Sequence, residues 1–413
     1  MNWWRKQHLL VQVAIGGAIG IVLGLIFGEN ISHISPIGDI FIRLLEMLIV
    51  PLTFFVLIDG ITNLPSIKSL RSIGGMTILY YATTTAIAAF LGICVALLIN
   101  PGKGAEGILT GGKDIEPEEF SFVENLVNWV PSNIIQSMAE TSMLQIIIAA
   151  TIIGIALLSL GESTKRITKL VHEGSILMLK ITDYIMKLAP LGILALIANL
   201  VGTTDLSILY ESIYYVLSAL LGLSILFFVV YPLLIKLLTN YSPIQFLKNV
   251  ASALTVAAAT SSSNATLPAS MAVSKKQGIS DKVYGFTLPL GATINMDGLA
   301  VTFGVTGVFA ANLYGLPITI GLILQFIFLG IALSMGTAGA RGADIVMMSI
   351  LMSTLGLPLE IVAIYAAVSP IIDTGNTVNN IFGDLTGTAI INKRYSGEDN
   401  LPTHDEKNIS TLS

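Results

Sequence analysis

The sequence predicts an all-α membrane protein with eight transmembrane helices and two re-entrant helical hairpins. Its 413 residues are 54% hydrophobic and only 11% charged, whereas soluble domains carry about 25% charged residues. Its apolar runs are long enough to cross a bilayer, which takes about 20 residues as a helix. Two further apolar stretches, 243–277 and 319–357, have centres rich in serine, glycine and asparagine. Such interrupted segments predict helical hairpins that enter and leave the membrane on the same side.

The first half of the chain has the pattern of successive spanning helices. The run from Leu9 to Phe27 is about as long as a bilayer is thick. The FGENIS that follows it lacks the cleavage pattern of a signal peptide, so we expect a retained first helix. Further apolar segments follow at 36–61, 72–99, 122–161 (broken near Pro131), 170–203 and 208–239.

The second half contains two units of a hairpin followed by a helix. SSSNATLP at 261–268 interrupts the first hairpin, and SMGTAGARG at 334–342 interrupts the second. Each hairpin precedes a long segment broken by polar residues, 283–313 and 361–392. A broken helix frees backbone groups, which a membrane tolerates only where they are buried in protein or line a wet cavity. Two such units in tandem indicate an internal repeat.

Basic residues predict the orientation, because cytoplasmic loops carry an excess of lysine and arginine. With the N-terminus inside, the cytoplasmic segments receive Lys68, Arg71, Lys165, Arg166, Lys169, Lys236, Lys248, Lys275, Lys276, Lys282, Lys393 and Arg394. The opposite side receives Lys103 and Lys113, both in an acidic loop. This asymmetry predicts a multi-pass protein of the cell membrane with both termini in the cytoplasm.

The residue types also argue against several other classes of protein. The single cysteine, Cys94, excludes an internal disulfide and a Cys-ligated metal site, and the four histidines have no metal-ligand or catalytic spacing. The sequence has no glycine-rich phosphate loop, GxSxG turn or basic nucleic-acid patch. No histidine or lysine base accompanies the serine run 261–263 in its membrane region, so we expect no enzyme.

The stretch 370–391 carries the most informative polar residues. They recur at i, i+3, i+4, i+7 and i+11, on one face of a helix: Asp373, Asn376, Thr377, Asn380 and Asp384. A charge at the bilayer centre costs about 2.5–3.5 kcal/mol, so two aspartates need a compensating partner such as a cation or an ammonium group. The alternative is a stripe that only hydrogen-bonds to neighbouring helices.

A second set of oxygen-bearing residues extends this pattern. Asn295 and Asp297 interrupt the 283–313 segment, and interrupted helices offer backbone carbonyls as well as side-chain oxygens to a hard cation such as sodium. Tyr81, Thr84 and Thr85 would complete an oxygen-rich pocket around Asp297. These residues fit a symporter, and a channel or receptor using the same polar stripe remains an alternative.

Five motifs stand in one order along the chain. They are YYATTT at 80–85, SSSNATLP at 261–268, PLGATINMDG at 289–298, GTAG at 336–339, and DTGNT at 373–377 followed by Asn380, Gly383 and Asp384. Over nearly the whole chain they resemble the dicarboxylate/amino acid:cation symporter family, the glutamate transporters. The resemblance implies the glutamate-transporter fold with inverted repeats, and symport of an amino acid with coupling ions.

The resemblance also implies three sodium sites. The first uses the Gly291 carbonyl, Asn295, Asn380 and Asp384. The second uses Tyr81, Thr84, Thr85, Asn295 and Asp297. The third uses backbone oxygens of Thr293, Ser334, Met335 and Thr337. Because every side-chain position is retained, Na⁺ is the expected coupling ion, with H⁺ as the alternative.

The implied substrate site departs from the family pattern. Asp373 matches the residue that holds the α-amino group, and the groups around the substrate's carboxylate and amine correspond to Ser262, Ser263, Ala340, Gly342, Thr377 and Asn380. Asn376 stands where acidic-substrate members have arginine, which makes a bidentate grip on a carboxylate. Leu299 replaces a threonine and Asp344 a small residue, and a carboxylate there should repel an acidic side chain.

We therefore expect a neutral amino acid as substrate. Glutamate, aspartate or a C4-dicarboxylate is the alternative, and a C4-dicarboxylate would leave Asp373 facing another negative charge. Arg341 could turn into the pocket and restore acidic selectivity. We expect instead that it pairs with Asp344 at i, i+3 spacing or points into water at the outer gate.

By resemblance, a homotrimer would work by an elevator mechanism. We expect scaffold helices 1–2 in 1–71, helix 3 of the transport domain in 72–100, and an extracellular loop in 101–121. Scaffold helices 4–5 would occupy 122–203, the rest of the transport domain 204–392, and a cytoplasmic tail 393–413.

Overall fold

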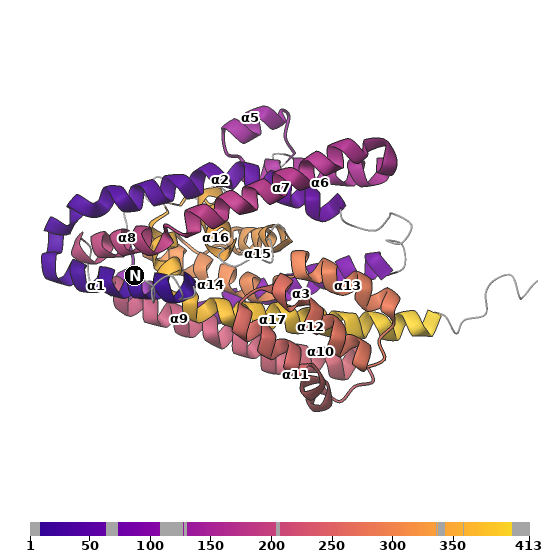
Figure 1. Ribbon diagram of the computed structural model, residues 1–413. Coiled ribbons are helices and arrows are strands. Elements are labelled where there is room, and N and C mark those ends of the chain that lie inside the picture. The colour runs from indigo at the N-terminus through magenta and orange to yellow at the C-terminus, as the bar shows by residue number, and fades with distance from the viewer. Residues whose placement is uncertain are drawn as a thin grey trace, which may run out of the picture.

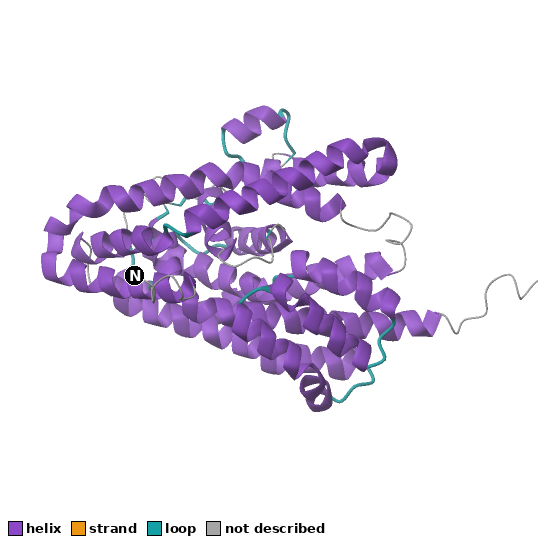
Figure 2. Ribbon diagram, viewed as in Figure 1, coloured by secondary structure: helices purple, strands orange, loops and turns teal. Residues whose placement is uncertain are grey.

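The computed structural model describes residues 9–62, 73–107, 127, 130–203, 207–335, 337, 343–357 and 359–398. Within these ranges the chain is helical and contains no strand (Figure 2). The all-α prediction is therefore confirmed for the described chain.

The helices follow one another along the chain as numbered in Figure 1. The first half contains α1 (Leu9–Phe27), the 3-10 segment η2 (Gly28–Ile34), α2 (Ser35–Thr62), α3 (Ile73–Ile99), η4 (Lys103–Ala105), α5 (Ile134–Ala139), α6 (Met143–Leu160), η5 (Gly161–Thr164), α7 (Lys165–Met186) and α8 (Ala189–Thr203). The second half contains α9 (Ser207–Ile225), the π-helical turn η6 (Leu226–Val230), α10 (Tyr231–Leu238), α11 (Pro243–Thr260), α12 (Ser263–Lys276), α13 (Asp281–Ile294), α14 (Asp297–Leu313), α15 (Ile320–Met335), α16 (Ala343–Thr354) and α17 (Glu360–Glu398).

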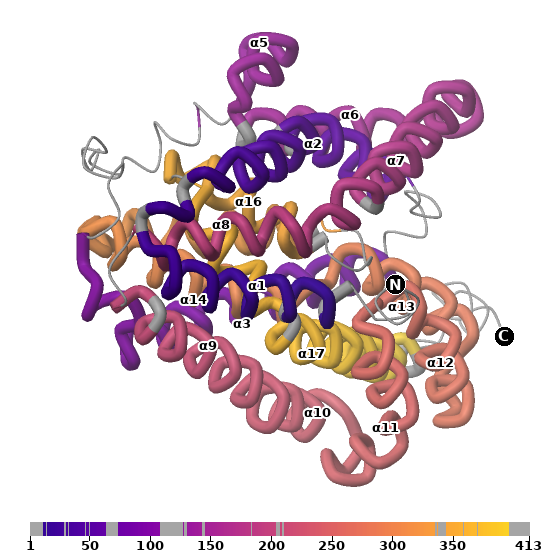
Figure 3. Tube along the Cα trace, turned by 60° about the vertical axis from the view of Figure 1, so that its left-hand side comes forward, coloured from indigo at the N-terminus to yellow at the C-terminus, as the bar shows by residue number. Residues whose placement is uncertain are grey.

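Two groups of helices lie side by side. α1 packs along α8, and α2 packs against α6, α7 and α8. In the other group, α14 contacts α3, α9, α15 and α17, while the α11–α12 pair packs on α17 (Figures 1 and 3). Every residue of α14 from Asp297 to Ala311 is buried, so this helix forms the centre of the second group.

The interruptions expected in the second half coincide with helix ends. α11 stops at Thr260 and α12 begins at Ser263, so the serine run separates two helices that pack on each other. α13 stops at Ile294 and α14 begins at Asp297, with Asn295 and Met296 in the break. α15 and α16 flank the GTAG motif, of which Thr337 alone is described.

Two segments differ from the expected pattern. The expected helix over 170–203 is divided into α7 and α8, because the chain leaves the helix at Lys187 and resumes beside Pro190, a residue suited to a helix start. α17 bends by 75° between its parts Glu360–Ser369 and Ile371–Tyr395. The bend falls at a proline, which cannot donate the hydrogen bond of a helix interior.

The described surface fits a membrane environment. Five helices are long and apolar enough to cross a bilayer, or six if the bent α17 counts as one span. Large apolar side chains are exposed on several helices, among them Ile26 at 68% and Phe228 at 68%. Exposed apolar side chains in such number are expected where a protein contacts lipid or partner proteins. The number of spans and the side of the termini stay predictions.

Close packing of α3 on α14 depends on small residues. A Cβ atom on Gly304 of α14 would overlap the Ala89 carbonyl oxygen of α3 and lie 2.9 Å from the Ile93 nitrogen. Both neighbours are backbone atoms that cannot turn away. This contact matters for function, because α3 and α14 carry Thr84, Thr85 and Asp297.

We predict that Gly304→Ala lowers the free energy of unfolding by about 1–3 kcal/mol, the usual cost of overpacking. Thermal unfolding of the detergent-purified protein measures the loss. Gly285→Ala in α13 is the matched control, since a Cβ atom added there would have no neighbour within 4 Å, and a helical Gly-to-Ala change there should leave stability equal or slightly higher. Equal melting of the two variants would contradict the packing account.

Candidate functional site

A polar cavity lies where the helix breaks meet. About 340 Å³ of space not filled by atoms lies within its outline, including the part that is open to solvent. Its described lining residues come from the α11–α12 break, the α13–α14 break, α16 and α17: Ser261, Ser262, Ser263, Met296, Leu299, Thr337, Asp344, Asp373, Asn376, Thr377 and Asn380. Eight of the ten residues expected around the substrate line it: Ser262, Ser263, Leu299, Asp344, Asp373, Asn376, Thr377 and Asn380. Ala340 and Gly342, like Arg341, lie outside the described residues.

The four polar residues from α17 face this cavity as the helical spacing predicts. Asp373, Asn376, Thr377 and Asn380 are each at most 7% exposed. The side-chain oxygen Oδ1 of Asn376 accepts a hydrogen bond from the Thr302 hydroxyl at 2.8 Å. The side-chain oxygen Oδ1 of Asn380 accepts a hydrogen bond from the Gly298 backbone N–H at 2.8 Å. Its side-chain nitrogen Nδ2 donates to the Met296 sulfur at 3.1 Å. Asn380 thereby ties α17 to the start of α14.

The serine run forms the beginning of α12. Ser262 is its N-cap, and its hydroxyl accepts from the Ala265 backbone N–H at 3.3 Å. Ser261 takes a left-handed conformation with φ of +46°, and its hydroxyl lies 3.2 Å from the Thr374 hydroxyl of α17. The first N–H groups of a helix have no partner within the helix and carry partial positive charge. The start of α12 is thus a favourable place for a carboxylate.

Asp297 lies in a fully buried cluster of hydroxyl groups. Its Oδ1 accepts from the Thr85 hydroxyl at 2.8 Å and from the Thr84 hydroxyl at 3.3 Å. Its Oδ2 accepts from the Tyr231 hydroxyl at 3.0 Å. Three helices, α3, α10 and α14, therefore meet at one carboxylate. Such hydrogen bonds lower the large cost of removing a carboxylate from water.

The Tyr81 side chain is buried beside the carboxylates of Asp297 and Asp384. Its hydroxyl donates to the Thr287 carbonyl at 2.8 Å, and no hydrogen bond between its side chain and Asp297 is found in the described chain. The hydroxyl also lies close to Gly291 and Asp384, since a Cβ on Gly291 would sit 2.6 Å from the Tyr81 hydroxyl oxygen and would overlap Asp384.

Asp384 and Asn295 form a second buried pair beside Asp297. The Asn295 amide donates to Asp384 Oδ1 at 2.9 Å. Gly383 makes the close approach possible: a Cβ there would lie 2.9 Å from the Asn295 amide nitrogen and 3.0 Å from Asp297 Oδ2. Asn295 Oδ1 is buried and has no hydrogen-bond partner among the described residues. Carbonyl and carboxylate oxygens in this arrangement are ligands that a hard cation prefers.

The residues expected at the third cation site lie close to the same break. The Ser334 hydroxyl accepts from the Met296 backbone N–H at 3.1 Å, and the Ser334 carbonyl accepts from the Thr337 N–H at 3.2 Å. Thr293 lies in the last turn of α13, and its hydroxyl bonds within that helix. Met335 ends α15. The Gly291 carbonyl, expected at the first site, accepts the Asn295 N–H at 2.9 Å and closes the last turn of α13.

Sequence reasoning missed several polar side chains of the site. Three buried hydroxyl groups donate hydrogen bonds there: Tyr231 to Asp297, Tyr365 to Asp344, and Thr302 to Asn376. Each lies in another helix from its partner, 21 to 74 residues away along the chain, so no local pattern identifies it. The π turn directly before Tyr231 is visible only in the structure, and such turns are frequent at functional sites.

A broken-helix bundle with a buried polar cavity and buried carboxylates defines a membrane transport protein. Comparison with known proteins agrees. The sequence model of the sodium:dicarboxylate symporter family matches residues 9–394, so the chain belongs to this family. The resemblance noted from the motifs is thus confirmed. Members of this family are transporters, so the protein is a symporter and not an enzyme.

Relatives of the chain cover almost its full length. It is 30% identical to the proton/sodium-glutamate symport protein of Bacillus caldotenax, over 96% of both chains. It is 27% identical to the C4-dicarboxylate transport protein of Bacillus subtilis, over 94% of this chain and 93% of that one. It is 30% identical to excitatory amino acid transporter 3 of Mus musculus, over 98% and 89%.

We predict that Tyr231→Phe destabilises the protein, because it removes a hydrogen bond to the buried carboxylate of Asp297. Hydrogen bonds to charged groups contribute about 1.5–3 kcal/mol, and thermal unfolding in sodium-free detergent solution measures that loss. Tyr210→Phe is the matched control, since Tyr210 lies in the preceding α9 and is 68% exposed. A Tyr231→Phe protein that melts with the control would show that this hydroxyl does not support Asp297.

Proposed function

We propose that this symporter couples inward Na⁺ movement to the uptake of an α-amino acid whose side chain is not acidic and is expected to be neutral. The cavity lining carries this proposal. It combines Asp373, a counter-charge for an α-ammonium group, with hydroxyls and the start of α12 for a carboxylate. Its described residues include Asp344 and Asn376 but no lysine, arginine or histidine. A side-chain carboxylate would therefore meet a like charge and no cation.

Sodium coupling is supported by the two buried carboxylates behind this cavity. Asp297 with Thr84 and Thr85, and Asp384 with Asn295, offer oxygen ligands away from water. A cation bound there would supply the positive charge that compensates the negative carboxylates. Each charge that moves inward yields about 2.3 kcal/mol per 100 mV, so a few coupled ions can concentrate a solute by orders of magnitude.

A second candidate is an acidic amino acid or a C4-dicarboxylate, with H⁺ as a coupling ion. The names of the relatives support it, since they include a proton/sodium-glutamate symport protein and a C4-dicarboxylate transport protein. The second candidate would need a cation from outside the described lining, and Arg341 is the residue in the sequence that offers one.

In the same proposal, the helices divide into a static scaffold and a transport domain that moves the substrate across the membrane. We assign α1, α2 and α5–α8 to a scaffold that would form a homotrimer in the cell membrane, with both termini in the cytoplasm. The transport domain would contain α3 and α9–α17. The contacts of α2 with α6, α7 and α8, and those of α14 with α3, α9, α15 and α17, support this division.

An amino-acid panel tests the substrate. In proteoliposomes with an imposed Na⁺ gradient, we expect accumulation of neutral amino acids such as serine, alanine or glutamine and little of glutamate or aspartate. Asp373→Asn should reduce uptake at least tenfold, because the ammonium loses its counter-charge (tenfold corresponds to about 1.4 kcal/mol). Asp281→Asn, at the exposed start of α13, is the control and should transport normally. Strong glutamate uptake alone would refute the neutral substrate.

Sodium dependence tests the ion site. Asp297→Asn keeps the shape of the side chain and removes its charge, so we expect the Na⁺ concentration for half-maximal uptake to rise at least tenfold, about 1.4 kcal/mol. Uptake measured against Na⁺ concentration, with choline replacing Na⁺ and Asp281→Asn as control, shows the shift. Uptake by the wild type that is indifferent to Na⁺ but driven by a pH gradient would transfer the coupling to H⁺.

A further inference from the structure

Asp344, in the cavity wall, has a carboxylate oxygen with no hydrogen-bond partner among the described residues. Asp344, in the first turn of α16, is 6% exposed and lines the cavity. Its Oδ2 accepts a hydrogen bond of 2.6 Å from the Tyr365 hydroxyl. Its Oδ1 is buried and has no hydrogen-bond partner in the described part of the chain. A buried polar atom without a partner costs free energy, and more so when it is charged.

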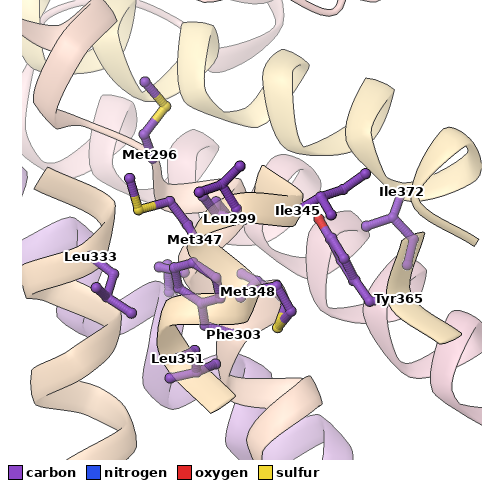
Figure 4. Close-up of a cluster of buried hydrophobic side chains, with 14 of the residues drawn as sticks. Met296, Leu299, Phe303, Leu333, Ile345, Met347, Met348, Leu351, Tyr365 and Ile372 are labelled. Atoms are coloured by element: carbon purple, nitrogen blue, oxygen red, sulfur yellow. The ribbon is translucent and has the colours of Figure 1, made fainter. Parts of the chain in front are cut away.

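Neighbouring side chains hold Asp344 in place. Tyr365 is 1% exposed and lies in the first part of α17, before the bend. Its hydroxyl points toward the start of α16 beside Ile345 (Figure 4). Leu299 and Met347, also buried, belong to the same apolar cluster. The Tyr365 hydroxyl and backbone N–H groups at the start of α16 orient the carboxylate, and Oδ1 has no partner among the described residues.

The charges that line the cavity also indicate that Asp344 lacks a cationic partner among the described residues. Its described lining contains two carboxylates, Asp344 and Asp373, and no cationic side chain. In the proposed function, the α-ammonium group of the substrate compensates Asp373. Nothing in the substrate backbone remains for Asp344, because the other charged group is a carboxylate. A donor group on the substrate side chain would supply the partner that Asp344 Oδ1 lacks among the described residues.

We propose that Asp344 determines specificity by selecting amino acids whose side chain ends in a hydrogen-bond donor, a hydroxyl, amide or ammonium group. This inference rests on the proposed amino-acid symport. It narrows the neutral side chains to those with a donor group and adds side chains that end in an ammonium group. An aliphatic side chain would leave Oδ1 unpaired, and sites built to bond a substrate donor reject analogues that lack it by large factors. An acidic side chain would bring a second negative charge to the same oxygen.

Three substrates of equal length test the proposal on the wild-type protein. Norvaline, homoserine and 2,4-diaminobutyrate differ only in a terminal methyl, hydroxyl or ammonium group. In proteoliposomes under an ion gradient, we expect kcat/KM for homoserine, for 2,4-diaminobutyrate or for both to exceed that for norvaline at least tenfold. Serine against alanine repeats the comparison with a shorter side chain. A higher value for the ammonium than for the hydroxyl would identify charge as the selected property, and the reverse would identify the hydroxyl.

A variant assigns the selectivity to Asp344. Asp344→Asn keeps the volume and an oxygen for Tyr365 but removes the charge and the second acceptor oxygen. The preference over norvaline that the wild type shows, for 2,4-diaminobutyrate or for homoserine, should therefore fall at least tenfold. Asp281→Asn, exposed at the start of α13, should retain the wild-type preferences. The wild-type comparison stands even if Asp344→Asn fails to fold.

The possible outcomes separate this inference from the function on which it rests. Equal kcat/KM for all three substrates would overturn the role of Asp344 and leave amino-acid symport intact. Equal values that become donor-selective in Arg341→Ala would assign the partner of Asp344 to Arg341 and would also overturn it. No uptake of any amino acid under Na⁺ or H⁺ gradients would overturn the proposed function itself.

Discussion

The structure depends on keeping carboxylates inside a helical bundle without leaving them unsupported. An isolated carboxylate removed from water is very costly, yet Asp297, Asp344, Asp373 and Asp384 are all at most 7% exposed. Hydroxyl and amide groups from other elements donate hydrogen bonds to three of them. The donors are Thr84, Thr85 and Tyr231 at Asp297, Asn295 at Asp384, and Tyr365 at Asp344. Because these donors come from other elements of the chain, each carboxylate also fixes how the helices pack. Function and fold thus share the same contacts.

Helix breaks bring these groups to one place. α12 begins with Ser262 as its cap, α14 begins with Asp297 after the break at Asn295, and Thr337 and Asp344 flank the segment between α15 and α16. A break exposes backbone groups that a membrane tolerates only inside protein or at a wet cavity, and all three breaks contribute to the lining of one cavity. Asn380 joins two of these elements, because it accepts from the Gly298 N–H and lines the same space.

Sequence reasoning succeeded where the pattern is local and failed where the partner is distant. The spacing from Asp373 to Asp384 predicts one helix face, and the polar insertions predict the helix ends at Thr260 and Ile294, because both depend on neighbouring residues. The donors Tyr231, Tyr365 and Thr302 lie in other helices than their acceptors, so tertiary packing decides which groups they meet. The division of 170–203 into two helices was missed because hydropathy averages across Lys187 and Pro190.

The central claim is that cations occupy the oxygen clusters at Asp297 and Asp384, beside the cavity lined by Asp373. Crystallography with thallium(I) in place of Na⁺ tests this claim most directly, because a heavy monovalent cation is located by its anomalous scattering. We expect anomalous peaks in contact with Asp297 and Thr85 and with Asp384 and Asn295, and their loss when Na⁺ is added in excess. Ordered carboxylates that contact only protein, with no peak beside either, would contradict it.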